Sequence, residues 1–343
     1  MARPTIPDLA KAAGVSRSTV SRVINSPDDV RAVTRWRVAE AAAEIGFLGL
    51  DELIKSLKPG QRPFRLRIFL QQPNKWFCDT FARAIHAARD EIAHIREIRL
   101  SVEHLTDLSP DAICERVRTA AARADAIVVL AAEHPLLTAA IEDSTARGTP
   151  VYAAVTTLSC SSLAGYVGLD GHKVGRTAAW ALQRLCDNPQ KIGVLVGSPR
   201  YRVHEYAESG FRSYFRENRP SIRLLEPLPT FESDGIAREM TEKLLTENPD
   251  LSALYLSAGG TKGALDALRD SGRANTIATI AYDLTDTTRQ ALLDGTVDLV
   301  ISHPFEEIAR QVMDVVLGGS DAVSKQSRVM RYIDFKVFTP ENI

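Results

Sequence analysis

The chain has 343 residues, which is enough for a small domain together with one large domain or two of medium size. Its formal net charge of -1 at pH 7 excludes a basic field over the whole surface. It has no apolar run of about 18 residues and no apolar signal core at its N-terminus, so we expect a cytoplasmic protein without membrane contact. The four cysteines show no Cys-x-x-Cys spacing, so we expect buried free thiols and neither a zinc site nor disulfides. They are Cys78, Cys114, Cys160 and Cys186.

The N-terminal end is more basic than the rest of the chain. Residues 1–37 hold seven cations and three anions, a local net charge of +4: Arg3, Lys11, Arg17, Arg22, Arg31, Arg35 and Arg37 against Asp8, Asp28 and Asp29. A local excess of this size is the electrostatic signature of a segment that binds DNA.

The first predicted elements are two short helices within residues 5–25, joined by a turn at Gly14. Apolar residues recur at helical spacing in both: Ile6, Leu9, Ala10 and Ala13, then Val15, Val20, Val23 and Ile24. Glycine permits the turn backbone, and the Ser16 hydroxyl can cap the second helix. The spacing therefore predicts a helix-turn-helix, whose second helix enters the major groove of DNA.

The outward face of the second helix consists of hydrogen-bonding side chains. Arg17, Ser18 and Arg22 are the expected base readers, because Arg22 can bind a guanine through two hydrogen bonds. The other polar residues are candidates for phosphate contacts: Thr5, Ser16, Thr19, Ser21, Asn25 and Thr34.

The run TIPDLAKAAGVSRSTVSRVIN at residues 5–25 resembles the N-terminal domain of the lactose-repressor (LacI/GalR) family of bacterial transcription regulators. The family pattern is met at most of its positions: Thr5, Ile6, Asp8, Leu9, Ala10, Ala13, Gly14, Val15, Ser16, Thr19, Val20, Ser21, Arg22, Val23, Ile24 and Asn25. The resemblance implies a DNA-binding domain at residues 1–46 and a homodimer that reads a pseudo-palindromic operator. The alternative is a chance helix pair in a metabolic enzyme, which so long a run disfavours.

A third helix is expected at about 32–45, and residues 47–63 form a link. By the same resemblance the link contains a hinge helix, in which Leu57 wedges into the minor groove between the phosphate-binding Lys55 and Lys58. The usual Pro-Asn before the hinge is replaced here by Gly49-Leu50. An ordinary amphipathic linker therefore remains an alternative interpretation of this segment.

From residue 64 onward, short apolar runs alternate with helical stretches. The expected strands are Leu66–Leu70, Ala126–Leu130, Val151–Val155, Ile192–Val196, Leu254–Leu256, Ile277–Ile280 and Leu299–Ile301. The expected helices lie at about 76–95, 110–123, 136–147, 172–186, 204–218, 235–246, 261–271 and 287–293. This alternation is typical of parallel sheets with helices on both faces.

An α/β core of two such halves, following an all-α helix-turn-helix domain, resembles the two-lobed periplasmic-binding-protein-like core that this family carries at residues 64–343. The first lobe is expected at about 64–160 and 304–320, and the second at about 165–300 and 325–343. The chain then crosses between the lobes three times. Ligands of such cores bind in the cleft at the carboxyl ends of the strands.

The residues that follow the expected strands are therefore candidates for an effector site. Asn74, Trp76 and Phe77 resemble the Asn-Pro-Phe-Phe element of ribose-type binding proteins, in which aromatic rings stack on a sugar. Thr156 follows the third strand. Asp170 either reaches the cleft or only caps the helix that follows it.

The second half of the core supplies the remaining candidates: Arg200, His204, Glu205, Gly259, Asp283 and His303. Where the family places an arginine that grips sugar hydroxyls, this chain has Glu205 after His204. Arg200 or Arg202 is expected to substitute for it. Gly259 lets backbone approach a ligand, Asp283 matches an acidic family position, and His303 lies at a crossing between the lobes. Such a pocket suits a sugar, a polyol or a sugar derivative.

Two other functions compete with an effector-controlled repressor. An enzyme is disfavoured because the chain has no G-x-S-x-G, Walker or G-x-G-x-x-G motif where one is needed. His86, Asp90 and His94 spread over about 12 Å of one predicted helix, which is too far for one metal ion. An exported solute-binding protein for transport is disfavoured by the DNA-binding segment.

Overall fold

The computed structural model describes residues 4–30, 32–49, 62–93, 96–186, 191–320 and 328–343. Within these ranges, every helix is too short or too polar to cross a lipid bilayer. The hinge residues expected from the sequence, Lys55, Leu57 and Lys58, lie outside the described residues, so the hinge stays a prediction.

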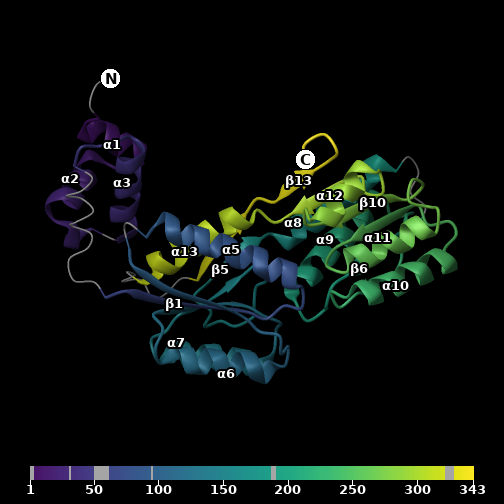
Figure 1. Ribbon diagram of the computed structural model, residues 1–343, viewed down its shortest axis with the longest axis horizontal. Coiled ribbons are helices and arrows are strands. Elements are labelled where there is room, and N and C mark those ends of the chain that lie inside the picture. Colours follow the sequence, from purple (N-terminus) through teal and green to yellow (C-terminus); the bar gives the residue numbers. More distant parts are fainter. Residues whose placement is uncertain (1–3, 31, 50–61, 94–95, 187–190, 321–327) are drawn as a thin grey trace.

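The N-terminal head is a bundle of three helices (Figure 1): α1 (Ile6–Ala12), α2 (Arg17–Asn25) and α3 (Ala32–Glu44), with a 3-10 turn η1 (Pro27–Asp29). Its core contains the predicted apolar residues Leu9, Val20 and Val23 with no exposed surface. Gly14 turns the chain with φ 61°, and Ser16 Oγ accepts a hydrogen bond from Thr19 N at 3.1 Å. The predicted turn and cap are thus confirmed.

The first lobe is a six-stranded sheet with the order β12-β5-β4-β3-β1-β2, all parallel. The strands are β1 (Phe64–Leu70), β2 (Ile98–His104), β3 (Ala126–Leu130), β4 (Val151–Ala154), β5 (Gly165–Leu169) and β12 (Val329–Ile333). One face is covered by α5 (Lys75–Glu91) and α13 (Phe305–Ser320), and the other by α6 (Pro110–Ala121) and α7 (Pro135–Ala146) (Figure 1). The central strand β3 is buried along its whole length, as expected for a parallel sheet covered on both faces.

The second lobe is built around a sheet with the order β13-β11-β10-β9-β6-β7, to which β8 adds beside β6. The strands are β6 (Lys191–Val196), β7 (Arg223–Leu224), β8 (Leu228–Pro229), β9 (Ala253–Leu256), β10 (Ala278–Tyr282), β11 (Leu299–Ser302) and β13 (Lys336–Phe338). Helices α8 (Gly171–Leu185) and α9 (Arg202–Asn218) pack on one face, and α10 (Asp234–Glu247), α11 (Thr261–Asp270) and α12 (Asp286–Leu293) on the other. Only β13 runs antiparallel to its neighbour in this sheet, as far as the structure describes it.

The sheets place two of the lobe boundaries later than the sequence predicted. Strand 165–169 pairs with β4, and strand 329–333 pairs with 165–169, so both belong to the first lobe rather than to the second. The chain crosses at about 170, 303 and 334. The alternation of elements reveals that strands exist, but it does not reveal which of two sheets an edge strand joins.

The four cysteines are free thiols, as predicted. Cys78, Cys114 and Cys160 are buried, and Cys186 is partly buried. Burial raises the pKa of the Cys78 thiol to about 12, which keeps it protonated and unreactive at neutral pH.

Two glycines let α8 and α9 approach each other closely. A Cβ at Gly175 would collide with the carbonyl oxygen of Ala207, and a Cβ at Gly210 with that of His172. We therefore expect Gly175→Ala to lower the free energy of unfolding by about 1–3 kcal/mol, because the helices must separate.

The measurement is thermal or urea unfolding of the full chain, with Gly235→Ala as the matched control. Gly235 lies on α10 with no neighbouring atom closer than 3.8 Å to an added Cβ, so alanine there leaves stability unchanged or raises it by about 1 kcal/mol. A Gly175→Ala protein as stable as the wild type would contradict the close contact.

Candidate functional site

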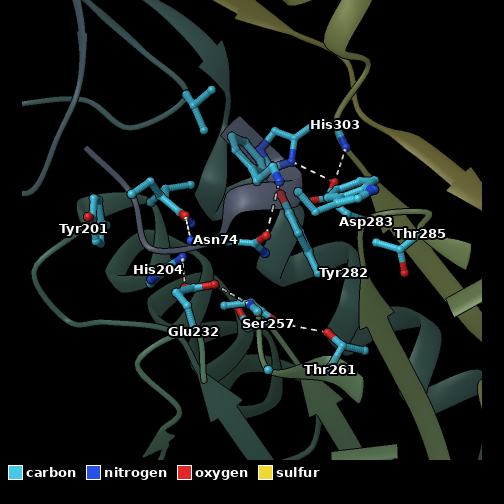
Figure 2. A pocket seen from close by; sticks show the side chains of 18 of the residues that line it. Asn74, Tyr201, His204, Glu232, Ser257, Thr261, Tyr282, Asp283, Thr285 and His303 are labelled. Atoms are coloured by element: carbon cyan, nitrogen blue, oxygen red, sulfur yellow. Dashed lines mark hydrogen bonds and ion pairs between the residues drawn. The ribbon is translucent and has the colours of Figure 1, made fainter. Parts of the chain in front are cut away.

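A cavity of about 320 Å³ lies between the two lobes. Its walls come from the segments that follow β1, β3 and β4 of the first sheet and β6, β8, β9, β10 and β11 of the second. Figure 2 shows polar side chains of several of these segments directed toward the same space. A cavity of this size, at the carboxyl ends of parallel strands, can hold one small molecule.

Most residues that the sequence singled out as effector-binding line this cavity: Asn74, Trp76, Phe77, Thr156, His204, Gly259, Asp283 and His303. Asp170, Arg200 and Glu205 do not line it. Asp170 Oδ1 caps α8 by accepting from Lys173 N at 3.1 Å, and the Arg200 guanidinium donates to Leu108 O at 3.2 Å. Glu205 lies exposed in the first turn of α9, because the helix turns that position away from the cleft.

The aromatic wall is positioned by a helix cap. Asn74 Oδ1 accepts from Phe77 N at 3.2 Å and so begins α5, which places Trp76 and Phe77 in the first turn. Phe77 is buried and packs edge-on against His303, with ring centroids 5.1 Å apart. Trp76 is 37% exposed and meets Phe305 by its edge, so part of its ring surface is open to a ligand.

Asp283 and His303 form a buried polar pair. Asp283 Oδ1 accepts hydrogen bonds from His303 N and from His303 Nδ1, both at 2.9 Å. Because Nδ1 donates to this carboxylate, the neutral ring carries its lone pair on Nε2. That Nε2 is buried and makes no hydrogen bond within the described part of the chain. It is an unsatisfied acceptor on a residue of the cavity lining.

Glu232 is the main lining residue that the sequence analysis missed. Its side chain is only 2% exposed, and it lies between Gly197 and Gly259, where a Cβ on either glycine would collide with the carboxylate. Glu232 Oε2 accepts from Gly259 N at 2.8 Å. Glu232 Oε1 accepts no hydrogen bond from any described residue. The two glycines thus make room for a carboxylate with one unsatisfied oxygen.

His204 faces this unsatisfied oxygen. Its Nε2 lies 3.6 Å from Glu232 Oε1, while its Nδ1 lies 3.0 Å from Ser198 O. Since a carbonyl only accepts, Nδ1 is the donor, and Nε2 carries a hydrogen toward the carboxylate only when the ring holds a second proton. Burial raises the pKa of Glu232 most; the charge of His204 in its protonated form and the hydrogen bond from Gly259 N lower it by less, and Asp283 adds a small further rise.

Three lining residues hold left-handed backbone conformations that are uncommon outside glycine: Val155 with φ 67°, Glu232 with φ 63° and Asp283 with φ 59°. Such strain persists only where the surrounding structure enforces it, and it gathers at binding sites. All three lie directly after or near the end of a strand, where the chain turns into the cleft.

The second candidate surface is the outer face of α2 in the head. Arg17, Ser18 and Arg22 are exposed there, and within the described residues neither arginine pairs with a carboxylate. The Ser16 hydroxyl lies 2.8 Å from both the Ser18 and the Thr19 hydroxyls, which gathers three hydroxyl groups at the N-terminus of the helix. This end of a helix attracts phosphate.

The remaining DNA-binding candidates lie close to this end or along the same helix. Thr5 begins α1, and its N and Oγ1 donate to Asp8 Oδ2 at 2.8 and 2.5 Å. Asn25 Nδ2 donates to Ser21 Oγ at 3.2 Å on the last turns of α2. Thr34 is half-buried near the start of α3. Their contact with DNA stays a prediction.

Two family models match this chain. Residues 5–48 match the family model of bacterial regulatory proteins of the lacI family. Residues 111–318 match the model of the periplasmic binding protein domain.

Curated relatives match through the head. The chain is 47% identical over 51 residues to the sucrose operon repressor of Vibrio alginolyticus, which covers 15% of this chain and 53% of that protein. It is 50% identical over 46 residues to the transcriptional regulator CelR of Thermobifida fusca, which covers 13% of this chain and 14% of that protein. The chain thus spans about half the length of the first relative and about one seventh of the second.

Solved structures match through the core. The glucose-galactose binding protein GanP of Geobacillus stearothermophilus superposes with a TM-score of 0.73 at 19% identity, over 82% of this chain and 99% of that one. A solute binding protein of an ABC transporter from Agrobacterium vitis, with bound D-fucose, superposes with a TM-score of 0.72 at 18% identity, over 81% and 96%. At these identities the likeness shows the two-lobed fold.

The unsatisfied carboxylate predicts how Glu232→Gln changes stability. The glutamine oxygen can still accept from Gly259 N, and its amide nitrogen can donate to the His204 Nε2 lone pair. The raised folded pKa means that wild-type stability falls as pH rises from the ordinary value of 4.5 through the folded value. The variant lacks this loss, so we expect it to be more stable at pH 8 by roughly 1–2 kcal/mol.

Thermal unfolding between pH 5 and pH 8 checks this expectation, and the difference should shrink toward the acidic end. Glu239→Gln is the control, since Glu239 is exposed on α10. A Glu232→Gln protein that is less stable than the wild type at pH 8 would show that the carboxylate is satisfied in a way that the contacts above do not reveal.

Proposed function

We propose that this chain, which belongs to the periplasmic binding protein domain family and carries the DNA-binding head of the lacI family, is a sequence-specific transcriptional regulator controlled by a ligand in its cleft. It acts as a repressor, and its ligand is a sugar, a polyol or a sugar derivative. The observation that carries the proposal is that one chain joins an exposed recognition helix to a two-lobed cleft with a cavity of about 320 Å³.

The head supports DNA reading by its geometry. Arg17, Ser18 and Arg22 project from α2 without acidic partners among the described residues, so they are available to base edges in the major groove. A head of this size covers only one half-site. We therefore infer a homodimer on a pseudo-palindromic operator, acting in the cytoplasm where the DNA lies.

Control by the cleft is supported by the position of α13. This helix begins at Phe305, whose ring centroid lies 5.0 Å from that of Phe77 in the cavity wall. Farther along, α13 packs against α3 of the head, where Asp314 lies close enough to Glu40 to raise its pKa, although burial raises it more. One rigid helix thus touches both the cavity wall and the head, which is the contact that effector control needs.

We infer that the cleft binds its ligand without converting it. The families matched by this chain are regulators and solute-binding proteins. The acidic and imidazole groups of the cavity are held by hydrogen bonds to backbone and to one another, which suits orientation of a ligand.

Selection of randomised DNA duplexes with the full chain tests the DNA-binding function. We expect an enriched site with two-fold symmetry. Loss of Arg22 removes a base contact, so Arg22→Ala should weaken binding to that site by about 1–3 kcal/mol and relax the sequence preference at one position of each half-site. Gel shifts at fixed salt measure both effects.

Arg147→Ala serves as the matched control, because Arg147 is an exposed arginine at the end of α7 in the first lobe, outside the head. It removes the same charge and should leave DNA affinity unchanged. An unenriched library, or an Arg22→Ala protein with intact affinity and selectivity, would refute the assigned recognition helix.

A further inference from the structure

We propose that the cleft ligand is a polyhydroxylated compound that bears a protonated amine, and that the amine binds at Glu232 Oε1 and His204 Nε2. This inference refines the proposed function and rests on it. Amino sugars and aminopolyols are the chemical class that fits.

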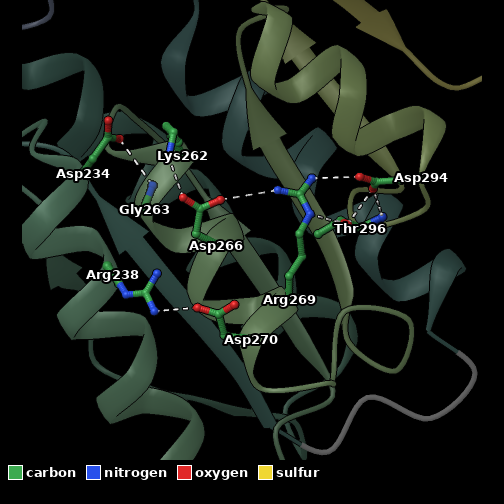
Figure 3. Close-up of polar contacts among 9 residues, drawn as sticks. All are labelled: Asp234, Arg238, Lys262, Gly263, Asp266, Arg269, Asp270, Asp294 and Thr296. Carbon is green, nitrogen blue, oxygen red and sulfur yellow. Dashed lines mark hydrogen bonds and ion pairs between the residues drawn. The ribbon is translucent and has the colours of Figure 1, made fainter.

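The charge of the cavity is the first observation. Four carboxylates line it, all from the second lobe: Glu232, Asp234, Asp283 and Asp286. Histidines aside, Lys262 is the single basic residue among the described lining residues, and its ammonium donates to Asp266 Oδ2 at 2.6 Å on the same helix (Figure 3). The first-lobe wall carries no charge within the described residues. The cavity therefore presents an excess of negative charge to its ligand.

The four carboxylates differ in solvent exposure: two are exposed and two are buried. Asp234 and Asp286 are exposed at the starts of α10 and α12. Asp283 is 8% exposed, and the Glu232 side chain is 2% exposed. Buried carboxylates are costly unless a cation or several donors compensate them. Asp283 receives two hydrogen bonds from His303, whereas Glu232 receives one from Gly259 N.

The arrangement of Glu232 and His204 indicates which ligand group could bind between them. His204 Nδ1 donates to Ser198 O, so whenever the ring carries only that hydrogen, its Nε2 and Glu232 Oε1 are two acceptors that face each other at 3.6 Å. A single proton shared by the two residues would satisfy both atoms, whereas a ligand group that satisfies both without that proton needs at least two hydrogens. An ammonium group has three hydrogens, and its positive charge neutralises the carboxylate. A hydroxyl group has one hydrogen and no charge.

The rest of the cavity suits a hydroxylated frame. His303 Nε2 is buried, unpartnered among the described residues, and able to accept from a hydroxyl. Trp76 offers exposed ring surface at the first-lobe side, which can pack on the apolar face of a sugar ring. The amine thus binds at the second lobe and the ring lies toward the first.

Calorimetry with matched probes tests the inference. At pH 7 the full chain is titrated with D-glucosamine, D-galactosamine, D-mannosamine and 1-amino-1-deoxy-D-sorbitol, and with the neutral parent of each. We expect at least one amine to bind about tenfold or more tightly than its parent. Glu232→Gln should reduce that preference to about threefold or less, and the control Glu239→Gln should leave it unchanged.

Three results would overturn the inference: a neutral parent that binds as tightly as its amine, a preference that survives Glu232→Gln, or no binding of any amine at about 10 mM. Gel shifts with the selected DNA site separate this inference from the proposed function. A neutral sugar that binds as tightly as its amine and changes DNA affinity refutes the preference for an amine but supports the proposed function. An amine that binds at Glu232 but leaves DNA affinity unchanged supports the amine and refutes effector control.

Discussion

Both lobes of the core are built on parallel strands, and the chain passes between them three times, so the carboxyl ends of the two sheets face one shared space. Loops at these ends carry the side chains that line the cavity, while the strands behind them are buried and hold the loops in place. The three crossings lie at about 170, 303 and 334. His303 lies in one of the crossings and is bonded to Asp283 of the second lobe, so part of the site belongs to the hinge itself.

The chemistry of the cavity depends on where its charges are buried. Asp283 is compensated by His303, but Glu232 is buried between Gly197 and Gly259 with one oxygen unsatisfied. Both residues occupy left-handed backbone conformations at the ends of strands. The rest of the fold must offset the cost of both features in the empty protein, and both features gather at binding sites. A ligand that satisfied Glu232 would therefore also raise the stability of the folded protein.

The head was predictable because its signals are local. The apolar spacing, Gly14 and the Ser16 cap lie within residues 5–25, and each acts on neighbours in sequence. The rule that ligands meet the ends of parallel strands found Asn74, His204 and Asp283. The same rule missed Glu232, because β8 before it is only two residues long, and the glycines that enclose its carboxylate come from other segments. Asp170 caps α8, and Glu205 lies on the side of α9 that faces away from the cavity, so neither residue lines it. The spacing of residues in the sequence does not reveal either effect.

The relation between cleft and head can be measured as a thermodynamic coupling. An effector that changes DNA affinity by some factor must have its own affinity changed by DNA by the same factor. The direct test is calorimetric titration of a cleft-binding amine into the full chain, first alone and then saturated with its selected DNA site. The proposed control of the head by the cleft predicts a change of about 5- to 150-fold in ligand affinity that equals the change in DNA affinity measured with saturating ligand. Equal ligand affinities with and without DNA would contradict it.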